Sequence, residues 1–249
     1  MAGTGTGMVV DHEPPDGYAK ARALVDSAMN ERQVGLGGAL DRVCTAVTAE
    51  LDLSGAAVHL MDENGHQGVA AASGTTGREW GEVAFTAGEG PCFDAWRTRL
   101  PVLVPDLATE AARWPGYASG LLGRSIGCVL AAPLSVGAVG FGVLDGYGPA
   151  RRSVDAEARG MLTAFARVAT EMLLDGRGVD GSGAVELSAT LDHRVEIHQA
   201  QGMVMVALQV TLVESLVRMR AHAFAADVPL LALARDVIAG RKDPREWLS

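Results

Sequence analysis

The hydrophobic and polar positions near the C-terminus predict the end of one helix and the start of another. An unbroken apolar run, Met203 to Leu208, is followed by Gln209 and then by Thr211-x-x-Glu214. The Thr and Glu have the spacing of a capping box, in which a hydroxyl and a carboxylate satisfy free backbone N–H groups at a helix start. A second helix is therefore expected to begin near Leu212.

A third helix is expected after a similar interruption at Asp227-Val-Pro229. Asp can cap a helix, and Pro is tolerated in the first turn because its missing N–H would have no partner there. Gly240 offers a permissive end. The third helix is thus predicted from Leu230 to about Ala239, which completes a set of three short helices.

The first of these helices is apolar on every side between Met203 and Leu208, whereas a helix that lies on one core needs only a stripe. The second and third helices carry such stripes and supply one covering layer. Their apolar positions are Leu216, Met219, Ala223, Leu230, Leu233, Ala234 and Val237. The other cover could be a second copy of the chain, so a homodimer is expected.

Residues 18–175 alternate between helical and strand periods and predict one α+β domain, an antiparallel sheet with flanking helices. The first two strands are joined by an Asn-Gly turn, and the segment between them and the last hairpin is an excursion with short helices. The predicted helices are Tyr18–Glu31, Leu36–Leu51, a short one near Phe93–Arg97, and Val154–Leu174. The predicted strands are Gly55–Met61, Gln67–Ala72, Leu100–Val104, Gly127–Leu134 and Val139–Gly146.

Composition separates this domain from its surroundings. Residues 1–17, with several Gly and Pro, are predicted to be a disordered tail, and the Gly-rich residues 176–184 a flexible linker that cannot hold a helix. Residues 185–249 then form the helical domain, and communication is expected through dimer geometry or direct docking. No segment has the basic start of a signal peptide or the roughly 18 apolar residues of a membrane helix, so a cytoplasmic protein without membrane contact is expected.

The net charge of −9 argues against general nucleic-acid binding, since phosphate contacts need Lys and Arg. From Val185 onward the chain has seven basic and eight acidic residues. Arg235, Arg241, Lys242 and Arg245 nevertheless fall within eleven residues, which leaves room for a local basic surface.

The three cysteines, Cys44, Cys92 and Cys128, fit neither a disulfide framework nor a zinc site and are predicted to be reduced. Cys44 and Cys128 are expected to be buried as small hydrophobic residues. Cys92 lies near a helix start, which favours thiolate, so a reactive thiol is an open alternative there. No metal site is expected, because no histidine has ligand-spaced partners.

The sequence RVEIHQAQGMVM, followed by LVRMRAHAF and PLLALARDVIAG, resembles the ANTAR domain, a bacterial three-helix module that binds RNA hairpins and relieves transcription termination. Two positions depart from the pattern: Gln201 stands where many members carry Lys, and Leu216 where many carry an aromatic residue. The resemblance is carried by Arg194, Ile197, Ala200, Gly202, Arg220, Ala234 and Val237. With it we expect an RNA surface made of Gln199, Ala200, Gln201, Gly202, Arg220, Arg241 and Lys242.

Three stretches ahead of this module, GEGPCFDAW, PVLVPDL and APLSVGAVGFGVLDGYG, resemble a GAF domain in their order along the predicted elements. A GAF domain is a sheet with helices on one face and a small-molecule pocket under loops on the other. The pocket would draw on His59, Trp80, Cys92, Trp96, Trp114 and Tyr117. Core packing is the alternative for the aromatic residues, and the ligand or cofactor is left open.

Together the resemblances imply a regulator rather than an enzyme. It would respond to a ligand or signal, bind hairpins in nascent transcripts as a homodimer, and promote transcription antitermination. Two alternatives stay open. The C-terminal helices could only dimerise a ligand-binding protein, or Cys92 and Cys128 could make a thiol-redox GAF enzyme.

Overall fold

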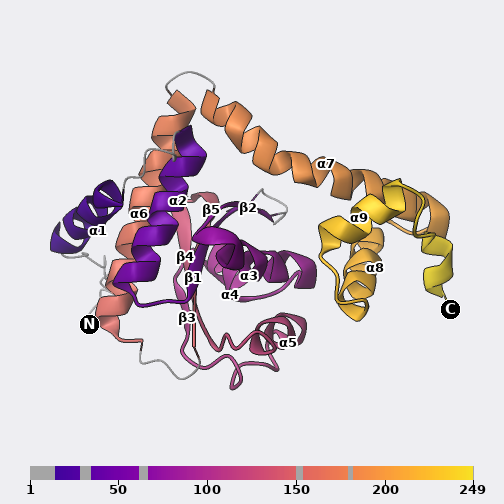
Figure 1. Ribbon diagram of the computed structural model, residues 1–249, viewed down its shortest axis with the longest axis horizontal. Helices are drawn as coiled ribbons and strands as arrows, with labels where there is room; N and C mark the ends of the chain where they lie inside the picture. Colours follow the sequence, from indigo (N-terminus) through magenta and orange to yellow (C-terminus); the bar gives the residue numbers. More distant parts are fainter. Residues whose placement is uncertain (1–14, 29–34, 62–66, 150–153, 179–181, 249) are drawn as a thin grey trace, which may run out of the picture.

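The computed structural model describes residues 15–28, 35–61, 67–149, 154–178 and 182–248 (Figure 1). They form a mixed α/β body and a helical bundle at one end of it. The predicted tail at 1–17 ends earlier than expected, because a helix already begins at Pro15. Residues 1–14 and the Asn-Gly turn at 62–66 lie outside the described residues.

The body is built on a five-stranded sheet with the order β2-β1-β5-β4-β3, and every neighbouring pair is antiparallel. β5 is the central strand, so it is paired along both edges. The strands are β1 (Gly55–Met61), β2 (Gln67–Ala72), β3 (Val102–Val104), β4 (Cys128–Val136) and β5 (Val139–Gly148). The predicted antiparallel sheet with flanking helices is confirmed.

One face of the sheet is covered by three helices and forms the larger apolar core (Figure 1). The helices are α1 (Pro15–Ser27), α2 (Gly35–Glu50) and α6 (Ala156–Gly178). Because side chains alternate along a strand, Val58 of β1 and Leu144 of β5 point to this face. They belong to the same apolar core as Phe165 of α6.

The opposite face is also covered, by helices from the excursion between β2 and β4. They are α3 (Gly74–Ala87), α4 (Pro91–Thr98) and α5 (Pro115–Leu122). This face takes Val143, Asp145 and Tyr147 from β5, three alternate positions of the central strand. The second apolar core lies between these helices and the sheet.

The helical bundle consists of α7 (Ser182–Leu208), α8 (Leu212–Ala225), α9 (Leu230–Ile238) and the short 3-10 helix η1 (Pro244–Leu248). The predicted cap is confirmed: Thr211 Oγ1 accepts a hydrogen bond from Glu214 N at 3.1 Å. The expected cap at Asp227 is wrong, because Asp227 has φ 51° within the turn after α8 and α9 begins after Pro229. Gly240 has φ 70°, as suits a residue just past a helix end.

The prediction that no helix forms in the Gly-rich linker is wrong. α6 continues to Gly178 and α7 begins at Ser182, so only residues 179–181 separate them outside the described part. The physical reason is that a helix that is already nucleated gains one hydrogen bond per added residue, while a Gly costs only about 1 kcal/mol relative to Ala. The first helix of the bundle is therefore much longer than expected.

Among the described residues, no single helix is long and apolar enough to cross a membrane. Residues Val195–Leu208 and Leu212–Ala225 reach the required length and hydropathy only as a pair, and the two helices are bent by 102° at the break between them.

Candidate functional site

A buried polar group lies on the sheet face beneath α3. His59 on β1 and Asp145 on β5 approach each other, with 3.1 Å between His59 Nε2 and Asp145 Oδ2. Tyr147, two residues along β5, donates its hydroxyl to the same carboxylate oxygen at 3.2 Å and lies 3.4 Å from His59 Nε2. All three side chains are fully buried. The register that pairs His59 with Val143 brings the imidazole beside Asp145 on this face.

Three other polar atoms of this region are buried and have no hydrogen-bond partner among the described residues: His59 Nδ1, Asp145 Oδ1 and Tyr117 Oη. Buried polar atoms are normally paired, and each unpaired one costs roughly 1–3 kcal/mol. The three atoms therefore mark a place where a polar ligand or a water molecule would be stabilised.

Burial and the nearby carboxylate keep the hydroxyls of Tyr117 and Tyr147 protonated. Burial, followed by the charge of Asp145, raises the pKa of Tyr117 and of Tyr147 well above the usual range of a phenol. Both hydroxyls are hydrogen-bond donors at neutral pH for this reason. The site can therefore offer donors to a ligand as well as the carboxylate of Asp145.

Cys92 is fully buried at the start of α4, close to the same carboxylate. Burial, and next the charge of Asp145, raises the pKa of the Cys92 thiol well above its usual range. The alternative of a reactive thiolate at this position is therefore wrong for this conformation, because the desolvation outweighs the helix terminus. Cys44 and Cys128 are buried and form no disulfide among the described residues, in agreement with the prediction.

The predicted pocket residues fall into two groups. Trp80 packs edge-on against Tyr147, with ring centroids 5.9 Å apart, and Trp114 lies in the same apolar core. Trp96 instead packs under the guanidinium of Arg99 and against Gly140. Gly140 is five positions before Asp145 on β5, about 16 Å along an extended strand, so Trp96 does not join the polar group.

Asp145 and Tyr147 were not among the predicted site residues. The signal that could have found Asp145 is a charged residue in the middle of an otherwise apolar strand. A carboxylate there has to be paired or serve a site, because burying an isolated charge is prohibitively unfavourable.

The segment Gly88-Glu89-Gly90 connects this face to the helical bundle. Gly88 ends α3 with φ 70°, and Glu89 Oε1 accepts hydrogen bonds at the start of α5 from Gly116 N at 2.7 Å and Tyr117 N at 3.3 Å. Gly90 has φ 139° and lies so close to the Tyr117 ring that an added methyl group would be 3.1 Å from it. The segment thus ends one helix and holds the start of another.

The bundle uses part of the predicted RNA surface for its own packing. Ala200 is fully buried, and Gln201, nearly as buried, donates from Nε2 to the Leu212 carbonyl at 2.6 Å. These two side chains tie α7 to α8 in this conformation and are not presented to solvent. The Gln at 201, where many similar sequences have Lys, is explained by this bond across the helix turn.

Other predicted residues of this surface are open. Gln199 is exposed, and a methyl group added at Gly202 would meet no atom within 4 Å. A crossing helix of the same chain is therefore not the reason for a glycine at this point of α7. Gln199 and Gly202 line a shallow groove together with Arg245, while Arg241 and Lys242 are exposed just before η1.

Most basic side chains of the bundle are paired with carboxylates. Among its described residues, the basic side chains outside such pairs are Lys242 and Arg220. The pairs are Arg218 with Glu214, Arg235 with Glu196, Arg241 with Asp236, and Arg245 with Asp243, at 2.7–2.9 Å. The bundle therefore offers few free cations, as its balance of charges indicates.

Arg220 points away from the groove and toward the end of α3. Its Cζ lies 5.9 Å from the centre of the Phe85 ring, and a methyl group added at Gly88 would come within 2.6 Å of its Nη1. Its Nε is buried without a hydrogen-bond partner among the described residues, and burial lowers the pKa of the guanidinium. The structure thus separates Arg220 from Gln199 and Gly202.

Comparison with known proteins agrees with both parts of the chain. Residues 34–173 match the GAF domain family, and residues 185–238 match the ANTAR domain family. The protein belongs to the GAF domain family, and its C-terminal part matches the ANTAR domain. A search of curated proteins found no match to this chain.

Solved structures agree with the fold of the GAF domain. The GAF domain of a phosphoenolpyruvate-protein phosphotransferase from Coxiella burnetii is 17% identical, with a TM-score of 0.52, and covers 65% of this chain and 95% of its own. The corresponding domain from Acinetobacter is also 17% identical, with a TM-score of 0.51, and covers 67% of this chain and 98% of its own. At this identity the likeness concerns the fold alone.

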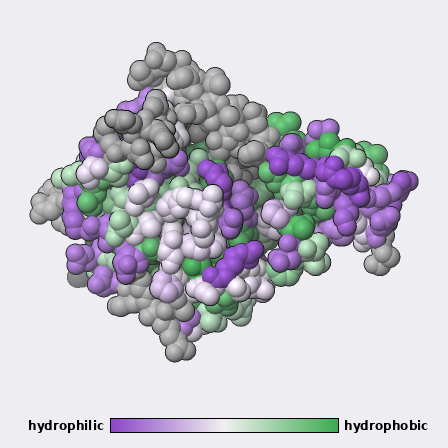
Figure 2. Space-filling view, viewed as in Figure 1, coloured by the Kyte–Doolittle hydropathy of each residue, from purple (hydrophilic) through white to green (hydrophobic). Residues whose placement is uncertain are grey.

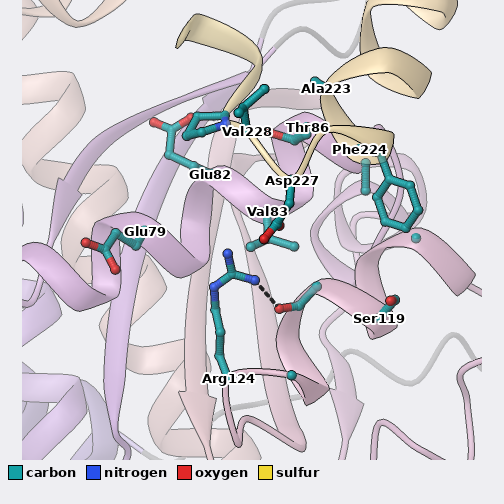
Figure 3. Close-up of a pocket in the computed structure, with 15 residues that line it drawn as sticks. Glu79, Glu82, Val83, Thr86, Ser119, Arg124, Ala223, Phe224, Asp227 and Val228 are labelled. Carbon is teal, nitrogen blue, oxygen red and sulfur yellow. Dashed lines mark hydrogen bonds between the residues drawn. The ribbon is translucent and has the colours of Figure 1, made fainter. Parts of the chain in front are cut away.

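α7 contacts α2, β2 and α6 of the GAF domain, and α8 contacts α3. A cleft of about 610 Å³ lies between α3, α5 and the turn after α8 (Figure 3). Phe224 reaches toward α5, and Asp227 and Val228 lie opposite α3. Direct docking, one of the two expected routes of communication, is present in this structure. The pairing of a sensor type of domain with an RNA-binding type of domain supports a regulatory role.

Proposed function

We propose that this protein is a signal-responsive regulator in which the GAF domain controls an ANTAR domain that binds hairpins in nascent transcripts and promotes transcription antitermination. The observation that carries the proposal is the open groove on α7, where Gly202 lies in the middle of a helix and a methyl group added to it would meet none of the described residues within 4 Å. A glycine there costs about 1 kcal/mol in helix stability, which is accounted for if another backbone approaches closely.

The proposed RNA surface consists of Gln199 and Gly202 in the groove and of Arg241 and Lys242 next to it. Arg241 shares its charge with Asp236, so Lys242 is the main phosphate contact in this conformation. Recognition would then rest on unstacked bases of a hairpin loop more than on its phosphates. Ala200 and Gln201 support this surface from below and do not contact the RNA.

Homodimerisation is the second part of the proposal. Four apolar residues near the turn between α7 and α8 are unusually exposed: Val206 at 72%, Leu212 at 51%, Val213 at 76% and Val217 at 57%. Figure 2 shows hydrophobic residues on the surface of this end of the molecule. Val213 and Val217 lie one turn apart on α8. Exposed apolar side chains so placed are typical of an interface, and a second copy of the chain would cover them.

The proposed signal is a small polar molecule bound by the GAF domain beside the unpaired atoms of His59, Asp145 and Tyr117. Trp80, Trp114 and Cys92 would line the apolar part of this site. In this proposal the chain transmits a signal and catalyses no reaction. The alternative of a thiol-redox enzyme is disfavoured by the burial of Cys92 and Cys128.

The test uses the two lysines of the chain, one in each domain. Binding of the full-length protein to a pool of labelled RNA stem-loops with randomised loops is measured over a series of salt concentrations. Lys242→Gln should weaken binding and reduce the salt slope by about 0.7, the contribution of one phosphate contact on single-stranded RNA. Lys20→Gln, which removes an equally charged but distant side chain on α1, should change neither.

Selective stem-loop binding by the unmodified protein is the outcome on which the proposal depends. If the protein selects no stem-loop even at low salt, antitermination through RNA binding is excluded. The helices would then serve dimerisation only, which is the rival interpretation. Equal effects of the two lysine substitutions would remove Lys242 from the RNA surface but leave the function standing.

A further inference from the structure

We infer that the GAF domain and RNA compete for the same surface of the ANTAR domain, the face of α8 that carries Arg220, so that the docked arrangement is a restrained state. This inference rests on the proposed RNA-binding function. The surface concerned is a second one, away from the α7 groove. In the absence of RNA this second surface is occupied by the GAF domain itself.

Arg220 has the properties of a phosphate-binding side chain that is covered. Of the basic residues described in the ANTAR domain, it and Lys242 are the two outside the carboxylate pairs. A guanidinium keeps its charge at any physiological pH and matches phosphate geometry. In the docked state this charge is held against the end of α3, where its Nε is buried and has no hydrogen-bond partner among the described residues.

The docking site of Arg220 is favourable enough to form but not optimal. The C-terminal end of α3 carries free carbonyl groups and a partial negative charge, which attract a cation. Against this, the buried Nε lacks a partner, and burial lowers the pKa of Arg220. An unpaired buried donor is destabilising. Release of Arg220 into water or onto a phosphate would remove that penalty.

The rest of the interface is also only partly packed. Phe85 of α3 is the residue of the GAF domain that enters the apolar core of the ANTAR domain, where it joins Met219 and Ala223 of α8. Beside it the domains enclose the cleft of about 610 Å³, and Phe224 at its edge remains half exposed (Figure 3). α7 also contacts α2, β2 and α6, but the contact of α8 with α3 has one apolar anchor beside an open cleft and is expected to separate readily.

Gly88 offers a substitution that acts directly on the contact with Arg220. In Gly88→Ala the new methyl group would come within 2.6 Å of the Arg220 guanidinium, the end of a flexible side chain, and displace it from α3. Because Gly88 has φ 70°, the change also strains the backbone. Gly74→Ala, at the other end of α3, is the matched control: Gly74 has φ 78° and nothing within 4 Å.

The experiment measures binding of each full-length variant to the same randomised stem-loop pool, together with the radius of gyration by small-angle X-ray scattering. One added phosphate contact on single-stranded RNA contributes about −0.7 to the salt slope, which strengthens binding about fivefold between 1 M and 0.1 M salt. Gly88→Ala should therefore bind RNA about fivefold more tightly than the unmodified protein at 0.1 M salt. It should also have a larger radius of gyration. Gly74→Ala should match the unmodified protein in both. Phe85→Ala removes the apolar anchor and should act like Gly88→Ala.

The outcomes separate the inference from the proposed function. Equal or weaker RNA binding by Gly88→Ala, with measurable binding by the unmodified protein, overturns the competition and leaves RNA binding intact. Equal gains in Gly88→Ala and Gly74→Ala also overturn it, because strain rather than Arg220 would be the cause. Failure of the unmodified protein and of every variant to bind any stem-loop overturns both.

Discussion

Asp145 is the residue on which the buried polar group depends. It accepts hydrogen bonds from the Tyr147 hydroxyl and lies 3.1 Å from His59 Nε2, and all three side chains are fully buried. Asp145→Ala would leave both partners buried without their acceptor. Removing one member of a buried polar pair costs about 3 kcal/mol, so the free energy of unfolding from urea denaturation should fall by that amount.

The control for this substitution is Asp26→Ala, an exposed carboxylate on α1 whose ion pair with Arg22 lies within the same helix. Such surface pairs contribute little, so the change should stay within about 0.5 kcal/mol. A loss at Asp145 no larger than the loss at Asp26 would show that the polar group does not stabilise the folded GAF domain.

The sequence indicates candidate site residues only through the chemistry of their side chains. His59, Cys92 and Tyr117 are chemically distinctive, and the structure brings them close to Asp145. Trp96 lies apart from them for a geometric reason: its place at the far end of β5 depends on the pairing of strands distant in sequence. The same holds for Arg220, whose neighbour Gly88 is more than a hundred positions away.

At the scale of elements, α3 shows glycines that are required by packing. A methyl group added at Gly77 would be 2.7 Å from the carbonyl oxygen of Ala56 on β1, which is backbone and cannot move aside. Gly77→Ala should therefore destabilise the protein despite the higher helix propensity of Ala. We expect a loss of about 1–3 kcal/mol, the usual range for overpacking, in urea denaturation.

Gly160 on α6 is the matched case with the opposite expected sign. It lies inside a helix, and an added methyl group would meet nothing within 4 Å. Gly160→Ala should raise the free energy of unfolding by up to about 1 kcal/mol, because only helix propensity acts there. If both glycine substitutions stabilise the protein, the close approach of α3 to the sheet is not rigid enough to matter.

The local sequence of each element decides whether that element could be predicted. The strands β1, β2, β4 and β5 follow from their apolar runs and differ from the prediction by at most two residues at either end. The α3 sequence, GTTGREWGEVAFTA, contains three Gly and three Thr, which are weak helix formers, and the sequence predicts it only as part of an excursion with short helices. The helix is stabilised by packing, because Trp80 is buried in the core beneath α3 and Phe85 in the core of the helical bundle. Local helix propensity does not reveal such burial.

At the scale of the whole molecule, α3 is shared by both domains. Its Trp80 covers the polar group through Tyr147, its Phe85 enters the ANTAR core, and Gly88 at its end meets Arg220. The following residue, Glu89, holds the start of α5 beside Tyr117. A ligand that moves Tyr117 would therefore act on Gly88 and Glu89, the segment that contacts Arg220. Transmission of the signal along the chain through residues 179–181 is then not required.

The proposed homodimer gives the last prediction at this scale. In a twofold interface each substitution occurs twice, so Val206→Glu would remove the burial of two valines of about 1.5 kcal/mol each and introduce two charges. Val206 is 72% exposed in the single chain, so the substitution should not harm the fold. The dimer dissociation constant from sedimentation velocity should rise by roughly 100-fold or more.

The control is Val136→Glu, at a similarly exposed valine at the end of β4. This substitution should leave the dimer dissociation constant unchanged, since β4 lies in the GAF domain away from the turn between α7 and α8. A protein that is monomeric at all concentrations would exclude the dimer, and a dimer equally weakened by both substitutions would move its interface away from this turn.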